Sequence, residues 1–204
     1  MTRHYFNRIA RLAAPAVLAA QALLGAAPAW ATVAPYLGLD DLEREAEVIV
    51  LGTVRDASGR LSDDGRIIET RIEVEVERVL KGGPRATITF DVPGGTYAGR
   101  TLVAEGAPSI RAGERVVLFL GRSGGGPAVP LGVAGWNQGH FRVRRDSRTA
   151  RDLVTQPRGG TIYVDRQGRP QPPDPRLTGP AVLEDFLRGV EAAIARGRSK
   201  EHSP

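Results

Sequence analysis

A Gly-x-Ser-x-Gly match is the motif in this sequence that is associated with nucleophilic catalysis. Residues Gly121 to Gly125 read Gly-Arg-Ser-Gly-Gly, and a serine hydrolase would use Ser123 as its nucleophile. The catalytic form of this motif lies on a sharp turn between a strand and a helix. Here it lies between two expected strands, inside a run of glycines, so we interpret it as a flexible hairpin loop and predict no catalytic residue.

Metal ligands are scarce in the sequence. It contains no cysteine and three histidines, at positions 4, 140 and 202, which is too few for a cysteine-based or histidine-rich zinc site. Asp56, Asp63 and Asp64 could hold Ca²⁺ in a polar loop, but their spacing does not fit an EF-hand, and we interpret them as solvated acids. We therefore expect no metal and no cofactor.

The stretch Gly-Trp-Asn-Gln-Gly-His, which starts at Gly135, is the best candidate for a binding site. Two interpretations are open. In the first it is a tight turn or bulge in which Gln138 bonds exposed backbone groups, Trp136 covers the end of a barrel, and His140 bonds a neighbouring carboxylate or carbonyl. The second is a ligand-contacting rim made by Trp136, Asn137, Gln138 and His140.

A run of arginines follows this stretch, at positions 142, 144, 145, 148 and 151. Arg142 and Arg144 alternate with apolar residues, which is typical of the solvent face of a strand. The alternative is a basic patch in which Arg142, Arg144 and Arg145 contact anionic lipid or polysaccharide. Nucleic acid is not an expected partner, because the chain has few aromatic side chains that could stack on bases.

The pattern of apolar residues predicts a mostly β protein. Apolar and charged side chains alternate along residues 67–80, which indicates a long strand with one buried face, and a buried strand at 48–54 precedes it across a polar loop. Further short strands are expected at 86–92, 101–104, 115–120, 129–133, 140–144 and 161–164. Turn residues separate them without alternating helices, so we expect a small closed barrel rather than a Rossmann-type sheet.

Two helices complete this outline. Residues 39–46 predict a short N-terminal helix, and Pro180 is expected to start a C-terminal amphipathic helix after a cap at Thr178 or Gly179. The apolar stripe of the second helix consists of Leu183, Phe186, Leu187, Val190 and Ile194. We expect this stripe to dock on the barrel rather than on a partner protein.

The first 31 residues have the pattern of a secretory signal. A basic start is followed by an apolar run at 12–24 and by Ala-Trp-Ala, so cleavage is expected after Ala31. A retained membrane anchor is the alternative, but the run is shorter than the roughly 20 residues of a spanning helix. Removal of this segment takes away three arginines and no acid, which lowers the formal net charge from +5 to +2 and leaves little attraction for polyanions.

Several segments between about Leu42 and Asp146 resemble an exported bacterial family of unassigned function. They are AEVIVLGTV, IETRIEVEVERVLKG, VPGGTYAG, PSIRAGERVVLFL and GWNQGHFRV. The more specific elements are Val-Leu-Lys-Gly, Pro-Gly-Gly, the Ala-Gly-Glu-Arg turn and Gln-Gly-x-Phe. That family is similar to the OB-fold barrel of the tissue inhibitors of metalloproteinases, and its members are often found near secreted metalloproteases.

The resemblance implies an OB-like barrel and a link to a secreted metalloprotease. The animal inhibitors begin with a cysteine whose amine and carbonyl chelate the protease zinc, and disulfides hold them together. This chain has no cysteine and would begin Thr32-Val33-Ala34-Pro35 after cleavage, so its free α-amino group is the part that could still reach a metal. No functional residue transfers one for one.

The sequence therefore predicts an exported, monomeric, mostly β protein, periplasmic or extracellular. Its expected parts are a signal peptide (1–31), an OB-like β-barrel domain (32–146) and a Pro/Gly-rich extension with a C-terminal helix (147–204). We expect a non-enzymatic binding module, an inhibitor or companion of a secreted protease. The alternatives are an envelope-associated structural protein that contacts anionic lipid or polysaccharide through its arginines, and an enzyme of a kind that the motifs do not reveal.

Overall fold

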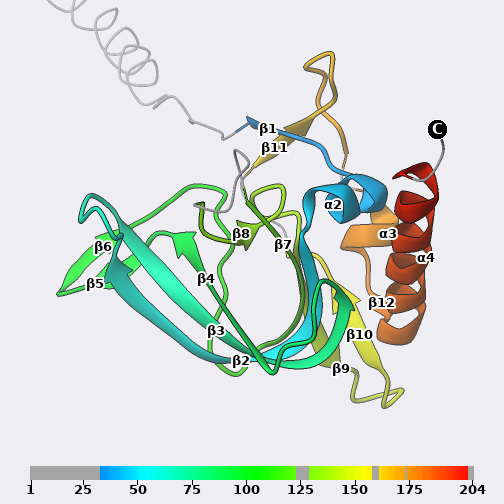
Figure 1. Cartoon of the computed structure of the whole chain (residues 1–204), viewed down its shortest axis with the longest axis horizontal. Coiled ribbons are helices and arrows are strands. Elements are labelled where there is room, and N and C mark those ends of the chain that lie inside the picture. The colour runs from blue at the N-terminus through cyan, green and yellow to red at the C-terminus, as the bar shows by residue number, and fades with distance from the viewer. Residues whose placement is uncertain (1–32, 123–128, 158–160, 173, 202–204) are drawn as a thin grey trace, which may run out of the picture. The chain divides into compact units, whose positions relative to one another are not determined.

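Two long antiparallel strands form the centre of the fold (Figure 1). β2 (Val48–Leu61) and β3 (Ile68–Lys81) pair along their whole length. The computed structural model describes residues 33–122, 129–157, 161–172 and 174–201. These residues belong to one compact unit that begins at Thr32.

The main sheet has the strand order β12-β10-β9-β7-β2-β3-β4, with β8 paired to β7 as well. Its other strands are β4 (Thr87–Pro93), β7 (Arg115–Gly121), β8 (Gly132–Val133), β9 (His140–Arg145), β10 (Asp152–Thr155) and β12 (Ala181–Val182). Two small sheets lie beside it, one of β5 (Gly95–Tyr97) with β6 (Arg100–Leu102), the other of β1 (Val33–Pro35) parallel to β11 (Ile162–Val164). The helices are α2 (Leu39–Glu45), α3 (Pro175–Thr178) and α4 (Leu183–Glu201).

The main sheet curls strongly but does not close. Figure 1 shows β2, β3 and β4 curving round toward β8. In the described part of the chain β4 pairs with β3 and with no other strand, and β8, with two residues, is too short to offer it a ladder. The mostly β class is confirmed, whereas the closed barrel that we expected is not formed by these strand pairs.

Side chains that alternate across the sheet build two apolar cores. Because β2 and β7 are covered on both faces, they carry continuous apolar runs rather than alternating ones. The core inside the curl includes Val50, Val74, Phe90, Val116 and Leu118. The core on the outer face includes Leu51, Phe119, Phe141, Phe186 and Val190.

Helix α4 covers the outer face of the sheet, beside α2 and α3 (Figure 1). All five residues of its predicted apolar stripe are buried there, so the expectation that this helix docks on its own sheet is confirmed. Its expected start at Pro180 is wrong, because Ala181 and Val182 pair with β10 and the helix begins at Leu183. No helix in the described ranges combines the length and the apolar character needed to cross a membrane.

Two segments differ from the expected outline. The polar loop expected after residue 54 is largely strand, because β2 continues to Leu61 and pairs there with β3. Gly59 allows this, since a Cβ at that position would lie 1.9 Å from the carbonyl oxygen of Thr96 in β5. The main sheet also continues beyond Asp146 into β10 and β12, so the region expected to be an extension contributes strands to the same sheet as residues 32–146.

The outer core depends on Phe141, which is fully buried between two other rings. Its ring centroid lies 5.6 Å from that of Phe119 and 4.8 Å from that of Phe186. We expect Phe141→Ala to lower the free energy of unfolding by roughly 3–5 kcal/mol, because it leaves a cavity between sheet and helix. Urea unfolding measures this loss. The control Val103→Ala, at a side chain that is 74% exposed, should cost less than about 0.5 kcal/mol, and similar losses in the two variants would contradict this packing.

Candidate functional site

A buried glutamine fastens the first described strand to the turn that starts at Gly135. The Nε2 group of Gln138 donates to the carbonyl oxygens of Pro35 (2.8 Å) and Gly135 (3.1 Å), and its Oε1 accepts from the backbone N–H of Leu37 (2.8 Å). One edge of β1 is therefore held by this amide and the other by β11. Gln138 bonds backbone groups, as the turn interpretation predicted.

The turn displays Trp136 at the surface on a backbone that few large residues adopt. Gly135 has φ 60° and Trp136 has φ 67°, and left-handed values of this kind are strained for a bulky side chain. A Cβ on Gly135 would lie 2.5 Å from Cδ1 of Leu37, so a larger residue there would combine the strain of the left-handed backbone with a displacement of the Leu37 side chain. The indole Nε1 of Trp136 donates to the carbonyl oxygen of Glu105 at 3.1 Å, while the residue stays 41% exposed.

Trp136 lies between two surface hollows. The smaller one, of about 320 Å³, lies between the turn and β1 and is lined by Val33, Leu37, Glu45 and Gln138 among others. The larger one, of about 690 Å³, extends from Trp136 to the tip of the β2–β3 hairpin. Trp136 lines both.

Two further exposed apolar residues lie near the smaller hollow. Val33 lines it and is 61% exposed, and its register partner Ile162 in β11 is 44% exposed. We call Val33, Trp136 and Ile162 the Trp136 surface. Val33 and Trp136 line the same hollow, and Ile162 is linked to them through its pairing with Val33.

The ligand-contacting rim that we considered is not assembled. Of its four residues only Trp136 is exposed, because the other three turn into the protein. Asn137 donates from Nδ2 to the carbonyl oxygen of Pro157 at 3.3 Å, and Gln138 holds β1. His140 is fully buried beside Leu118, its register partner in β7.

His140 has none of the partners that we expected for it. Among the described residues neither ring nitrogen has a hydrogen-bond partner, so no carboxylate or carbonyl accepts from it. Burial lowers the pKa of His140 from 6.5 to about 3, and the nearby positive charge of Arg142 acts in the same direction. The neutral imidazole is thus part of the interior of the sheet.

The arginines are largely engaged by their own neighbours. Arg142 donates from Nη2 to the carbonyl oxygen of Ser109 (2.6 Å), and its Nε lies 3.3 Å from a carboxylate oxygen of Glu114. Arg145 donates to Asp152 (3.1 Å), and hydrogen bonds from Arg145 and then from Arg115 lower the pKa of that carboxyl. Arg144 is exposed and forms no ion pair with the described side chains, so one of the three predicted contact residues is free for an anionic surface.

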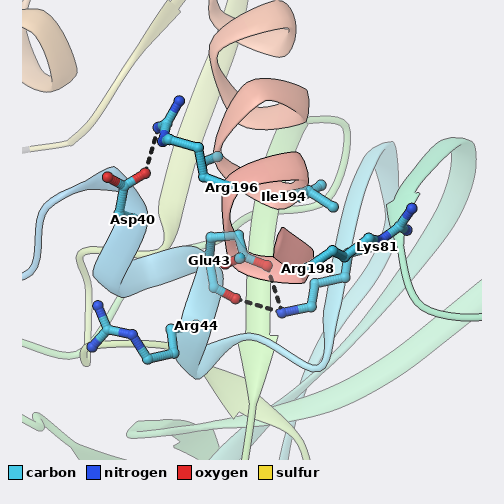
Figure 2. A pocket seen from close by; sticks show the side chains of 9 residues that line it. Asp40, Glu43, Arg44, Lys81, Ile194, Arg196 and Arg198 are labelled. Atoms are coloured by element: carbon cyan, nitrogen blue, oxygen red, sulfur yellow. Dashed lines mark hydrogen bonds and ion pairs between the residues drawn. The ribbon is translucent and has the colours of Figure 1, made fainter. Parts of the chain in front are cut away.

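A charged hollow of about 450 Å³ lies between α2 and α4 (Figure 2). Nζ of Lys81 lies 2.8 Å from the buried carboxylate of Glu43 and donates to the carbonyl oxygen of the same residue at 2.7 Å. Arg196 of α4 pairs with Asp40 of α2. These groups satisfy one another and fasten α2 to β3 and to α4, which is a structural role.

The remaining candidates from the sequence are the serine of the hydrolase-like motif and the acids considered as metal ligands. Ser123 of the Gly-x-Ser-x-Gly match lies outside the described residues. Asp63 pairs with Arg60, and Asp64 accepts hydrogen bonds from the hydroxyl of Ser62 and the backbone N–H of Arg66, which lower its pKa. Within the described ranges, no group of three or more histidine or carboxylate side chains is placed to hold a metal ion.

Sequence reasoning missed the contribution of β1 and β11 to this site. Each has three residues, and 129 positions separate Val33 from its register partner Ile162. A three-residue strand has too few positions for a periodic pattern. The nearest local signal was the apolar triplet Ile162 to Val164, which we interpreted as a strand but could not pair.

The chain matches no family model, no curated protein and no solved structure. The resemblance to the inhibitor-like family therefore stays a prediction that depends on the motifs quoted above. The function proposed below therefore depends on the geometry of the Trp136 surface.

The clamp made by Gln138 can be tested with Gln138→Met, which keeps the length of the side chain and removes its polar groups. We expect the backbone amides of residues 33–37 to exchange hydrogen at least about tenfold faster, because the hydrogen bonds that hold β1 are lost. Mass spectrometry of the N-terminal peptides measures this rate. Gln167→Met, in an exposed turn, is the control, and unchanged exchange in Gln138→Met would show that the amide does not hold β1.

The burial of His140 predicts an acid-dependent loss of stability. The unfolded chain takes up a proton near pH 6.5 and the folded chain only near pH 3, so between these values the unfolded state binds more protons and is favoured as the pH falls. Relative to His140→Leu, the wild type should lose roughly 1.4 kcal/mol of unfolding free energy per pH unit in this window. Urea unfolding of both proteins at several pH values measures the difference. Parallel pH profiles would contradict the buried, neutral histidine.

Proposed function

We propose that this chain is an exported, non-enzymatic binding module that contacts a protein partner, foremost a secreted protease, through the Trp136 surface. Tryptophan is enriched among the residues that contribute most to protein interfaces. Here it stands exposed and shares a hollow with the exposed Val33, whose register partner Ile162 is exposed as well. Its strained backbone is typical of residues that are held for a function.

The observation that carries the proposal is the clamp of β1 by Gln138. A strand held on one side by β11 and on the other by a buried amide presents Val33 in one orientation. Ordering a flexible segment on binding costs conformational entropy, and a segment that is already ordered avoids that cost. Fixed presentation of an N-terminal strand is thus an advantage for a binding protein.

The same arrangement supports the inhibitor form of the proposal. Cleavage after Ala31 would leave one residue before Val33, so the new chain end would directly precede β1. A partner protease that docks on the Trp136 surface would then meet this end. The link to the inhibitor-like family and the export of the chain are parts of this proposal.

An envelope-associated role through the arginines has less support. Arg142 and Arg145 are engaged by Glu114 and Asp152, and a surface that recruits anionic lipid or polysaccharide needs uncompensated charge. Arg144 alone would contribute little. This role is the second candidate.

The proposal predicts the outcome of a pull-down from native envelope and secreted fractions, using protein that begins at Thr32. We expect capture of a protease, identified by mass spectrometry, and inhibition of its activity by the added protein. Trp136→Ala should reduce capture at least about tenfold, because an aromatic anchor is removed. Arg144→Glu is the matched surface control and should capture as the wild type does.

Three other outcomes would count against parts of the proposal. Capture unchanged by Trp136→Ala would remove the Trp136 surface from it. Capture of lipid or glycan alone, lost in Arg144→Glu, would favour the second candidate. Loss of a captured metalloprotease when one residue is added before Thr32 would support the inhibitor form, whereas unchanged capture would show that the chain end is not involved.

A further inference from the structure

The two hollows beside Trp136 carry the same sign of charge. The smaller one contains a single charged lining residue, Glu45. The larger one is lined by four carboxylates, Asp63, Asp64, Glu69 and Asp91, and by one arginine, Arg66. A ligand that lies across Trp136 therefore meets negative charge on both sides of the ring.

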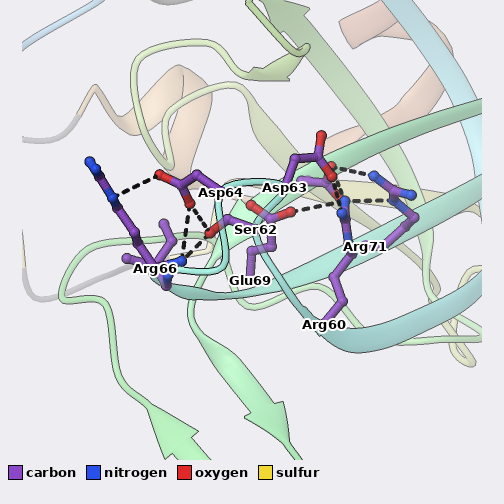
Figure 3. Close-up of polar contacts among 9 residues, drawn as sticks. Arg60, Ser62, Asp63, Asp64, Arg66, Glu69 and Arg71 are labelled. Atoms are coloured by element: carbon purple, nitrogen blue, oxygen red, sulfur yellow. Dashed lines mark hydrogen bonds and ion pairs between the residues drawn. The ribbon is translucent and has the colours of Figure 1, made fainter.

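The carboxylates of the larger hollow are not fully neutralised by their neighbours (Figure 3). Arg60 pairs with Asp63, with Glu69 (3.0 Å) and with Asp91 (3.3 Å), and Arg71 pairs with Asp91 (2.8 Å). In the described part of the chain, three carboxylates thus share two guanidinium groups. One negative charge remains without a counterion of its own.

Asp64 does not change this balance, because it has its own partner in Arg66 at 3.6 Å. The surroundings of Glu69 reflect the excess of negative charge. Burial raises the pKa of Glu69, and the nearby Asp91 raises it further. A cation placed beside Glu69 and Asp91 would remove this repulsion.

Glu45 is in a comparable position in the smaller hollow. Burial raises the pKa of Glu45, and Asp41 raises it further. Glu45 forms no ion pair with the side chains that the structure describes. A second cation could be bound here, on the opposite side of Trp136 from the first.

The walls between these charges are apolar. Trp136 separates the hollows, Val33 and Leu37 line the smaller one, and Pro130 and Leu131 line the larger one. Both hollows are open to solvent, so a segment that crosses the ring can enter each of them from the surface. In an extended segment, side chains two residues apart point in the same direction and lie about 6.8 Å apart, so an apolar residue and the residues two before and two after it can all face the protein.

We infer that the partner segment docked on the Trp136 surface is an extended stretch of polypeptide with a lysine or arginine two residues before and two residues after an apolar residue. The apolar residue packs on the indole ring, one basic side chain reaches Glu45, and the other reaches Glu69 and Asp91. An acidic segment would meet like charge in both hollows, which excludes it. This inference depends on the proposed function, since it names the chemistry of the partner at the same surface.

A phage-displayed library of random peptides, selected on the protein from Thr32, tests this chemistry without knowledge of the partner. We expect enriched sequences in which lysine or arginine occurs two residues before and two residues after an apolar residue. A synthetic peptide of the enriched sequence, labelled with fluorescein, should bind in anisotropy titrations and should bind more weakly as salt is added, because exposed charge pairs are screened.

Variants of the protein assign each contact in the same titration. Trp136→Ala should weaken the peptide at least about tenfold, and Glu45→Gln and Glu69→Gln should each weaken it roughly threefold to tenfold. Glu191→Gln on α4, an exposed carboxylate paired with Arg78, is the matched control and should leave binding unchanged. Circular dichroism of each variant checks that the amide substitutions preserve the fold.

Several results would overturn the inference. In the selection, these are the absence of any enriched sequence and the enrichment of acidic or uncharged sequences. In the titration, it is peptide binding that does not change in Glu45→Gln and Glu69→Gln. Failure of the proposed function is distinguishable from these results. If a pull-down captures no protein partner while basic peptides still bind, the proposed function is contradicted and the inferred peptide chemistry is supported. Capture of a protease without any preference for basic peptides would support the proposed function and contradict the inference.

Discussion

The ladder between β2 and β7 is the interaction on which the rest of the molecule depends. It runs from Val48 opposite Leu120 to Thr53 opposite Arg115, and its side chains alternate between the core inside the curl and the core under the helices. A slip of one residue would exchange the two sets, so each core fixes the register that the other needs. No disulfide reinforces this mutual constraint, since the chain has no cysteine.

The same ladder positions the proposed binding surface. The backbone of Phe119 in β7 donates to the carbonyl oxygen of Gly139 and accepts from the N–H of Ala134, so both ends of the turn that carries Trp136 are bonded to a doubly buried strand. A Cβ on Gly139 would lie 2.8 Å from the carbonyl oxygen of Phe119, which explains why glycine stands there. The exposed ring is thus supported by hydrogen bonds to a buried strand, as a preorganised interface requires.

Sequence patterns predicted those elements whose periodicity is long enough to carry information. The alternation from Ile68 to Val76 identified β3, and the stripe from Leu183 to Ile194 identified α4 and its buried face. Closure of the sheet could not be predicted, because it depends on whether the free edge of β4 pairs with another strand. No local sequence pattern indicates such a long-range pairing. The burial of His140 was equally hidden, since alternation places it on one face of β9 without indicating whether that face is covered.

The backbone and the exposure of Trp136 are the reason why we propose more than a structural role for this turn. A left-handed residue in a turn is most stable as glycine, asparagine or aspartate, and a bulky one costs about 1–3 kcal/mol of strain. The ring of Trp136 recovers part of this through its hydrogen bond to Glu105, yet it remains 41% exposed and so gains only part of the burial that a tryptophan can provide. A purely structural turn would be better served by a smaller residue. The exposed part of the ring, between two hollows that both carry carboxylates, is the part that the proposed partner would bury.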